Sequence, residues 1–291
     1  MRIAILGVGL IGGSIGLAAR RRAGAYVSAY DPNLRAAAAA LELGAVDERA
    51  PDVASAVAGA QVVFAAAPVG VLAGTVREAL AAAGGDCVVS DVGSTKLALA
   101  GAREDPRFVG GHPLAGAETA GVAHAREDLF DGATWYLTPT PTADRALYAR
   151  LRTVIETLGA HPAEIDASAH DRLMACVSHL PHVLANVLAT QAAAAFTREG
   201  APPTGGPSLR DTIRVAGANT AIWTDIYLAN RDALIEAIEQ ATGALGEVRA
   251  ALTRADGEAL AAWNERARAA REQILAAHPP SADTPPADAA P

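Results

Sequence analysis

Lysine is almost missing from this chain. Lys96 is the only one, and every other fixed positive charge is an arginine. Any mechanism that needs a lysine after position 96 is therefore excluded. Cysteine is scarce as well: Cys87 lies in an apolar strand pattern and Cys176 in a helical one. We expect both to be buried free thiols in a reducing compartment rather than parts of a disulfide framework.

Positive charge is also in deficit, with 24 Lys and Arg against 32 Asp and Glu. The net charge of −8 argues against nucleic acid or an anionic membrane as the main partner. The chain enters a strand pattern without a basic and apolar leader, and we see no apolar run that approaches the ~20 residues needed to span a bilayer. We therefore expect a cytoplasmic protein. Its 291 residues are enough for two domains.

A glycine-rich turn follows the first predicted strand. The apolar run 3–6 leads into Gly-x-Gly-x-x-Gly at Gly7, Gly9 and Gly12, and a helical pattern follows. This context is typical of a dinucleotide-binding turn. The first glycine permits the turn, the second lets a pyrophosphate approach the backbone, and the third lets the helix pack on the strand. Leu10 and Ile11 lie where the helix start offers N–H groups to phosphate.

An acidic residue completes this fingerprint. Asp31 follows the second predicted strand, Tyr26–Tyr30, 19 residues after Gly12. A carboxylate there accepts the ribose hydroxyls of NAD and repels the 2′-phosphate of NADP, so we expect NAD. Arg35, one helical turn further on, weakens this preference. The alternative is a glycine-rich turn in a protein that has lost its cofactor.

Strand and helix patterns alternate through the first half. Further strands are predicted at 61–66, 87–91, 108–111 and 135–138, and helices at 10–22, 34–43, 69–83 and 143–158. This alternation predicts an α/β fold, a Rossmann-type doubly wound parallel sheet with helices on both faces. Ligands of such sheets bind beyond the carboxyl ends of the strands. Pro68 and Asp91 follow strands at that edge, and we expect both to bind the cofactor.

The second half has only helical patterns. One long helix is predicted over 167–196 with a kink at Pro181, and helices continue from 209 to about 277 with breaks near Gly217 and Gly257. We therefore expect an NAD-binding domain over 1–165, an all-helical substrate and dimerisation domain over 166–278, and a disordered tail over 279–291. Helices this rich in alanine pack closely, which favours a homodimer through the helical domain.

Two polar clusters lie at predicted strand ends. His112 follows the strand 108–111, where an imidazole with a pKa near neutrality can take a hydroxyl proton as a hydride leaves the same carbon. Ser94 follows the neighbouring strand and is placed to hydrogen-bond to His112 or to a substrate hydroxyl, while Asp91 can cap the next helix. A loop histidine with a local hydrogen bond and a helix-capping serine explain the same positions.

A third cluster lies in the helical half. Ser178 and His182 are four residues apart and share a helix face. Arg214 is a candidate carboxylate clamp, because guanidinium binds carboxylate through two parallel hydrogen bonds. Its alternative is a surface or interface arginine. Three histidines gather here, but no zinc-site spacing is present, and we expect no metal.

These clusters, in this order behind the glycine turn, resemble the prephenate dehydrogenase family, the prephenate and arogenate dehydrogenases of tyrosine biosynthesis. The His-Pro-Leu-Ala-Gly and Ser-His-Leu-Pro-His sequences are the most specific. The similarity covers about residues 1–250 and is carried by these segments: Gly7–Ser14, Ser90–Lys96, Gly111–Gly116 with Glu118, His170–Asp171, Ser178–His182, Arg210–Asp211, Arg214 and Trp223.

The resemblance implies a reaction in which NAD accepts a hydride from C4 of prephenate and the ring carboxylate leaves as CO2, giving 4-hydroxyphenylpyruvate. It assigns the proton acceptor to His112, a hydrogen bond to Ser94, and a substrate carboxylate to Arg214. It implies that three residues line the substrate pocket between the domains and that two charged residues lie at its mouth: Ser178, His182 and Trp223, then Glu118 and Asp211.

Some family features are missing. Many members carry a C-terminal regulatory domain or a fused chorismate mutase, and this chain shows neither, so feedback by tyrosine would have to act at the active site or by another route. Arogenate or dual specificity stays open. A remote alternative is another Rossmann-plus-helical dehydrogenase or an imine reductase, but β-hydroxyacid dehydrogenases use a lysine in the helical domain. A non-enzymatic nucleotide sensor would not need His112, Ser94 and Arg214 together.

Overall fold

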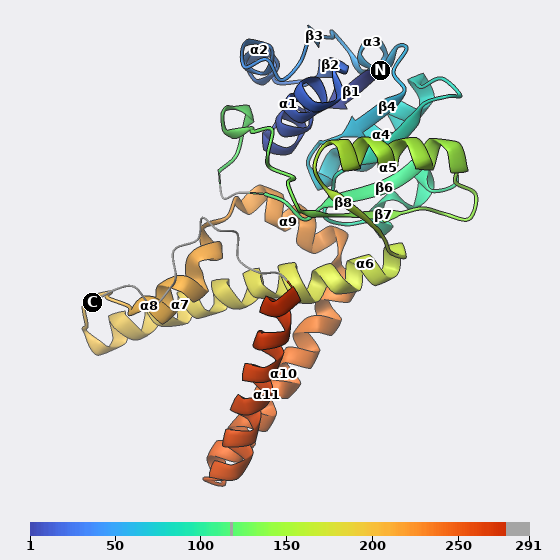
Figure 1. The fold of residues 1–291 in the computed structure, drawn as a ribbon. Coiled ribbons are helices and arrows are strands. Elements are labelled where there is room, and N and C mark those ends of the chain that lie inside the picture. Colours follow the sequence, from blue (N-terminus) through green and yellow to red (C-terminus); the bar gives the residue numbers. More distant parts are fainter. Residues whose placement is uncertain (117–118, 278–291) are drawn as a thin grey trace. The chain divides into compact units, whose positions relative to one another are not determined.

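The computed structural model describes residues 1–116 and 119–277 (Figure 1). The chain divides into two compact units, one over Met1–Ala237 and one that begins at Ile238. Glu118 and the predicted tail over 279–291 lie outside the described residues.

The first unit opens with alternating strands and helices, and every strand and helix predicted for this half is confirmed to within a few residues. The short β3, α3 and β8 are additional, because two to five residues carry too little periodicity. The elements are β1 (Arg2–Leu6), α1 (Leu10–Ala23), β2 (Tyr26–Tyr30), α2 (Leu34–Glu42), β3 (Glu48–Arg49), α3 (Val53–Val57), β4 (Val62–Ala65), α4 (Val69–Ala82), β5 (Val88–Asp91), the 3-10 turn η1 (Leu97–Ala102), β6 (Phe108–Pro113), the 3-10 turn η2 (Val122–His124), β7 (Thr134–Thr138), α5 (Arg145–Thr157) and β8 (His161–Glu164).

The eight strands form one sheet in the order β3-β2-β1-β4-β5-β6-β7-β8. Every neighbouring pair is parallel except β6 and β7, which run antiparallel with His112 opposite Tyr136. The expectation of a doubly wound sheet is confirmed, and the purely parallel sheet is corrected at this one pair. Antiparallel neighbours need no crossover helix, and among the described residues of this connection the short η2 is the one helical turn.

Two apolar layers cover the sheet. Side chains of α1, α2 and α5 pack with Ile3, Ile5 and Phe64 on one face. Side chains of α3 and α4 pack with Leu6 and Val63 on the other face. Neighbouring strand residues point to opposite faces, so β1 and β4 contribute to both layers, which explains their continuous apolar sequences.

Helices alone follow β8 in the first unit, as predicted (Figure 1). They are α6 (Ala167–Met174), the π-helical turn η3 (Ala175–His179), α7 (Leu180–Glu199), α8 (Pro207–Ile213), the 3-10 turn η4 (Arg214–Gly217) and α9 (Thr220–Ala229). A π-turn stands just before Pro181, where we expected a kink. Proline lacks an N–H and crowds the carbonyl of the preceding turn, and the wider π-turn accommodates both effects.

Two expectations about this helical region are wrong. Cys176 is exposed, whereas Cys87 is buried as expected. One helical stretch, Ala167–Glu199, is long and apolar enough to cross a membrane by length and composition, with 22% of its apolar window buried. Uncharged polar residues interrupt the apolar residues of this helix, so it contains no long uninterrupted apolar run. A single such helix is weak evidence for a membrane span.

The second unit contains most of α10 (Arg231–Thr253) and all of α11 (Gly257–Ala277), which confirms the break near Gly257. Among the described side chains from 238 to 276, Ala251 alone is buried. Leu245, Leu252 and Trp263 are exposed by 40% or more. This unit thus presents apolar surface that its own two helices do not cover.

Candidate active site

The glycine turn lies between β1 and α1. Gly7 has φ +100°, and a Cβ there would lie 2.6 Å from the Ala66 carbonyl oxygen. A Cβ on Gly12 would lie 1.9 Å from the Gly7 carbonyl oxygen. No side chain therefore fits where the helix contacts the turn. Around Gly9 nothing lies within 4 Å of a built Cβ, and no side chain caps the start of α1. Open space and free helix N–H groups together fit a phosphate.

Asp31 lies at the same edge of the sheet as the glycine turn. One carboxylate oxygen accepts a hydrogen bond from the Val8 N–H and the other from the Asn33 N–H, both at 2.8 Å. Each oxygen keeps a second lone pair, so the group can still accept ribose hydroxyls. Pro68 is exposed at the start of α4, at the end of the neighbouring strand β4.

Asp91 has a different role from the one expected. Its side chain is fully buried and accepts hydrogen bonds from the backbone N–H groups of Gly93 and Gly111, at 2.8 and 3.0 Å. It also pairs with Lys96, whose ammonium group donates to the Gly111 carbonyl. These contacts leave no accessible face for a cofactor, so the expected contact is wrong. Asp91 and Lys96 join the ends of β5 and β6 and thereby position the residue that follows, His112.

His112 lies at the end of β6 and is partly buried. Its Nδ1 lies 2.9 Å from Nε2 of His170, while the expected contact with Ser94 is absent. Within the described chain, the buried Ser94 hydroxyl has no hydrogen-bond partner. Burial lowers the pKa of His112 well below its usual range, and the positive charge of Lys96 lowers it further. The imidazole is therefore neutral at pH 7 and can accept a proton.

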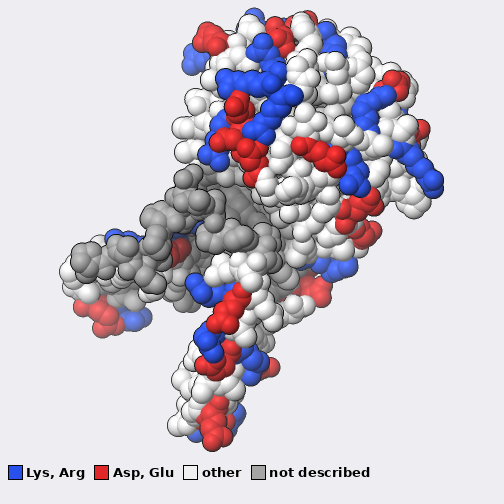
Figure 2. Space-filling model, viewed as in Figure 1, with Lys and Arg blue, Asp and Glu red and all other residues white. Residues whose placement is uncertain are grey.

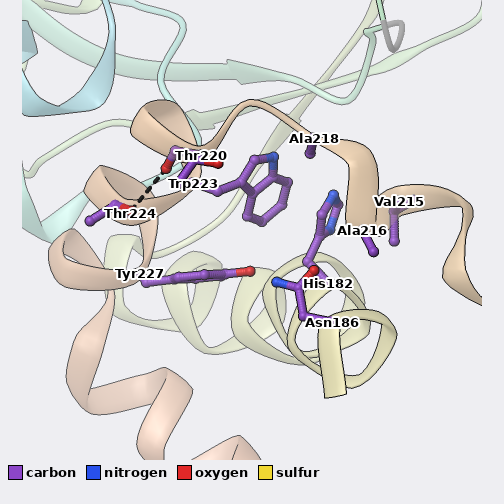
Figure 3. A pocket seen from close by; sticks show the side chains of 9 residues that line it. All are labelled: His182, Asn186, Val215, Ala216, Ala218, Thr220, Trp223, Thr224 and Tyr227. Carbon is purple, nitrogen blue, oxygen red and sulfur yellow. Dashed lines mark hydrogen bonds between the residues drawn. The ribbon is translucent and has the colours of Figure 1, made fainter. Parts of the chain in front are cut away.

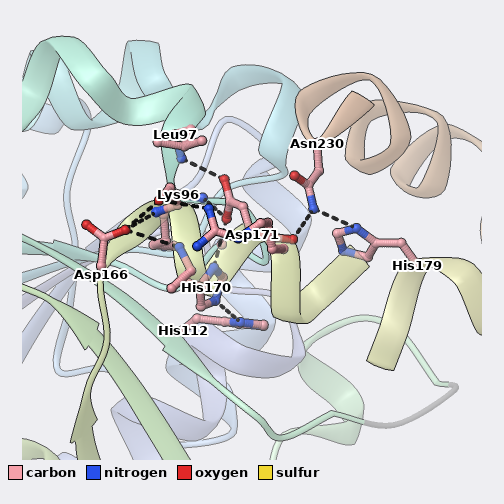
Figure 4. A network of polar contacts seen from close by, with 12 residues as sticks. Lys96, Leu97, His112, Asp166, His170, Asp171, His179 and Asn230 are labelled. Carbon is pink, nitrogen blue, oxygen red and sulfur yellow. Dashed lines mark hydrogen bonds and ion pairs between the residues drawn. The ribbon is translucent and has the colours of Figure 1, made fainter. Parts of the chain in front are cut away.

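A buried polar network continues from His112 (Figure 4). His170 donates from Nδ1 to Asp171 at 2.8 Å, and both side chains are fully buried. The Asn230 amide donates to the Asp171 carbonyl at 2.8 Å and lies 3.1 Å from Nδ1 of His179. The sequence pattern marked His170 and Asp171 without a role and gave no signal for Asn230, which lies at the junction of α9 and α10.

A pocket of about 140 Å³ lies next to this network (Figure 3). The ring of His182 stacks on Trp223 with centroids 3.3 Å apart, and the ring of His179 meets the Trp223 edge at 6.1 Å. Burial lowers the pKa of His179 to about 4. The lining residues come from α7, η4, α9 and the link between η4 and α9: His182, Asn186, Val215, Ala216, Ala218, Thr220, Trp223, Thr224 and Tyr227.

The other expected substrate residues lie around this pocket or away from it. The backbone carbonyl of Ser178 accepts a hydrogen bond from Nδ1 of His182 at 3.1 Å, so the His182 ring lies against the turn that contains Ser178. Arg214 is exposed at the start of η4. Burial of the His182 ring lowers its pKa, and the positive charge of Arg214 lowers it further. Asp211 is exposed on α8 and does not line the pocket.

Several charged groups outside the site form ion pairs. Figure 2 shows acidic and basic side chains side by side on the face drawn. Arg21 pairs with Glu127, and Arg22 pairs with Asp131. Over residues 1–116 and 119–277, no group of three His, Cys, Asp or Glu side chains is arranged to hold a metal ion.

A glycine turn on a doubly wound sheet, followed by helices that bring a histidine network to the carboxyl edge, defines a nucleotide-binding protein of the oxidoreductase class. Residues 15–164 match the family model described as prephenate dehydrogenase, nucleotide-binding domain, and residues 166–265 match prephenate dehydrogenase, dimerization domain. The chain belongs to the prephenate dehydrogenase family, and it is an oxidoreductase.

Individual relatives span almost the whole chain. The prephenate dehydrogenase of Bacillus subtilis is 33% identical, over 94% of this chain and 76% of the relative. The cyclohexadienyl dehydrogenase of Zymomonas mobilis is 32% identical, over 95% and 97%. The crystal structure of A. aeolicus prephenate dehydrogenase in complex with hydroxyphenyl propionate and NAD+ superposes with a TM-score of 0.85 at 28% identity, over 94% of this chain and 98% of that one. Synechocystis arogenate dehydrogenase gives 0.82 at 28% identity, over 94% and 100%.

Proposed function

We propose that this protein catalyses the NAD-dependent oxidative decarboxylation of prephenate to 4-hydroxyphenylpyruvate and CO2 in tyrosine biosynthesis. One observation carries most weight: a neutral histidine, His112, stands at the same edge of the sheet as the glycine turn. A base at the cofactor edge is what removal of a hydroxyl proton during hydride transfer requires.

The residues present fit NAD. The backbone around Gly9 is open to a pyrophosphate, and Asp31 is placed to accept ribose hydroxyls and to repel a 2′-phosphate. Leu10 and Ile11 supply backbone N–H groups at the start of α1, and Pro68 lies on the adjoining loop. The A. aeolicus relative was crystallised with NAD+. When bound, NAD accepts the hydride from C4 of the substrate.

The protein's own part is to orient the substrate and to move one proton. His112 takes the proton of the C4 hydroxyl on Nε2 as the C4–H bond breaks. The C1 carboxylate then leaves as CO2, and its bonding electrons complete the aromatic ring and place negative charge on the C4 oxygen. His112 returns the proton there, which gives the phenol. Aromatisation drives this decarboxylation, so no further acid or metal is needed.

We propose that the substrate carboxylates bind to residues of the helices that follow β8. Arg214 is the proposed clamp, and Ser178, His182 and Trp223 are proposed to line the substrate site. The family resemblance assigns Asp211 and Glu118 to its mouth. The proximity of Arg214 to His182 supports this arrangement, since its charge affects the pKa of that ring. Ser94 is proposed to bond to the substrate hydroxyl, because its buried oxygen has no partner in the described chain.

Arogenate is the second candidate substrate. It differs from prephenate by an amino group in place of the side-chain keto oxygen. Relatives with a similar degree of identity include an arogenate dehydrogenase and a cyclohexadienyl dehydrogenase, which supports dual specificity as an alternative.

We further propose that the protein is a cytoplasmic homodimer and that its two domains meet near residue 165.

The deciding experiment is NADH formation at 340 nm with prephenate and with arogenate, each with NAD or NADP and with or without tyrosine. We expect the highest kcat/KM with prephenate and NAD. A higher kcat/KM with arogenate would make arogenate the preferred substrate. A higher kcat/KM with NADP would contradict the proposed role of Asp31. No reduction of either cofactor with either substrate would refute the proposed reaction.

A further inference from the structure

Three residues of the candidate active site form a continuous chain of hydrogen bonds. Asp171 bonds to Nδ1 of His170 at 2.8 Å, and Nε2 of His170 bonds to Nδ1 of His112 at 2.9 Å (Figure 4). The two histidine rings meet edge to face with centroids 5.1 Å apart, and Tyr136 packs on His170 at 5.9 Å. Both ring orientations are thus fixed by packing as well as by hydrogen bonds.

The backbone around Asp171 determines which atom carries each proton. One carboxylate oxygen accepts the Lys96 N–H and the other accepts the Leu97 N–H, both at 2.8 Å. Backbone N–H groups can only donate, so both oxygens of Asp171 act as acceptors, and the anionic carboxylate is the form that these contacts fit. His170 must therefore donate to it from Nδ1. A neutral His170 then has only a lone pair on Nε2, and it accepts from His112.

These hydrogen bonds fix the tautomer of His112. Its Nδ1 carries the proton that is donated to His170, so the lone pair is on Nε2. This Nε2 forms no hydrogen bond with a described residue, whereas in the other tautomer it would carry the proton and could not act as a base. After His112 accepts a proton, the same chain places the anionic Asp171 behind the new imidazolium and stabilises it.

We propose that His170 and Asp171 are positioning residues that hold His112 in the Nδ1–H tautomer, with Nε2 as the proton acceptor. This inference rests on the proposed function, because it names what activates the proposed base. It adds two residues to the site that act through His112. The tautomer of His112 can be measured without any substrate.

The test begins with the full-length wild-type protein, labelled with 15N in its histidine rings. Long-range 1H–15N correlation spectra distinguish the protonated from the unprotonated nitrogen of each ring, and the His112→Asn variant identifies the His112 signals. We expect His112 to be protonated on Nδ1 alone at pH 7.5. Protonation on Nε2 alone, or a doubly protonated His170, would overturn the proposal. This result holds whatever the substrate proves to be.

Kinetics of two variants complete the test. In His170→Leu the acceptor is lost, and we expect kcat to fall about 30-fold or more while the substrate KM and the NADH dissociation constant change less than about 3-fold. In His170→Gln, whose amide oxygen can accept from Nδ1, part of kcat should return. The control is His161→Gln, an exposed histidine on β8. An unchanged kcat in a folded His170→Leu protein would contradict the positioning role, and the wild-type tautomer decides the matter if that variant does not fold.

Discussion

At the scale of single residues, His112 is the proposed base, and its surroundings determine whether it can accept a proton. We predict that His112→Asn lowers kcat about 10²- to 10⁴-fold, the usual contribution of a general base, and leaves the NAD dissociation constant unchanged. NADH formation and a cofactor-binding titration measure the two quantities. Ser94→Ala is the matched comparison: the Ser94 hydroxyl forms no hydrogen bond with His112, and we expect a fall of less than about 10-fold. Near wild-type turnover of His112→Asn would remove it as the base.

Arg214 is the second residue with a sharp expectation. Gln keeps a polar side chain but loses the charge and the forked hydrogen bonds, so Arg214→Gln should raise the KM for prephenate by the equivalent of about 2 to 4 kcal/mol. Steady-state kinetics at saturating NAD measure it. Arg210→Gln, an exposed arginine one helical turn earlier, is the control and should leave the KM within about 3-fold. Equal effects of the two variants would remove Arg214 from the site.

Residues whose role is set by local backbone could be predicted from sequence, and those set by distant contacts could not. Gly7 and Gly12 act through the turn in which they lie, and the turn forms as predicted. Asp91 looked available for a cofactor, but Lys96 folds back onto it and buries it. The sequence favours Ser94 as a partner of His112 or of a substrate hydroxyl, yet His112 contacts His170, 58 residues away. Tertiary contacts of this kind leave no periodic pattern.

At the scale of elements, the strands and longer helices follow from apolar periodicity, because each has enough residues to show it. The π-turn η3 does not: its residues Ala175–His179 read as ordinary helix. Its position matters, because it lies between His170 on α6 and His182 on α7. Both histidines keep their places only if this turn keeps its geometry, and the buried His179 inside it is bonded to Asn230.

His179 makes this turn sensitive to acid. Burial lowers its pKa in the folded protein to about 4, below the unfolded value near 6.5, so below pH 6.5 the unfolded chain binds the extra proton. The free energy of unfolding is therefore lost as pH falls from 6.5 towards 4. Chemical unfolding at pH 7 and pH 5 should show a decrease about 2 kcal/mol larger in wild type than in His179→Gln.

The exposed His161 provides the control for this measurement. His161→Gln should lose as much free energy of unfolding between pH 7 and pH 5 as the wild type does. If His179→Gln and wild type instead lose the same amount, protonation of His179 does not govern the acid stability of the turn.

At the scale of the whole molecule, helix α7 has too few partners within its own chain. Of its 20 residues only Ala185 is buried, and Leu184 and Val187 are exposed by 42% and 46%. The second unit has the same character, with Leu245 and Leu252 exposed seven residues apart on α10. Apolar surface of this extent is typical of an interface, and residues 166–265 match a family model described as a dimerization domain.

We predict that Val187→Glu converts a dimer into monomers. In a monomer the new carboxylate lies in water and costs little, but at an interface it must be buried without a partner. The dissociation constant should rise about 100-fold or more, equivalent to about 2.7 kcal/mol, as measured by sedimentation over a concentration series. Leu41→Glu is the matched control, because Leu41 on α2 is equally exposed, at 45%, and lies in the nucleotide-binding half. If both variants remain dimers, α7 is not the interface; if wild type is a monomer at high concentration, the dimer itself is wrong.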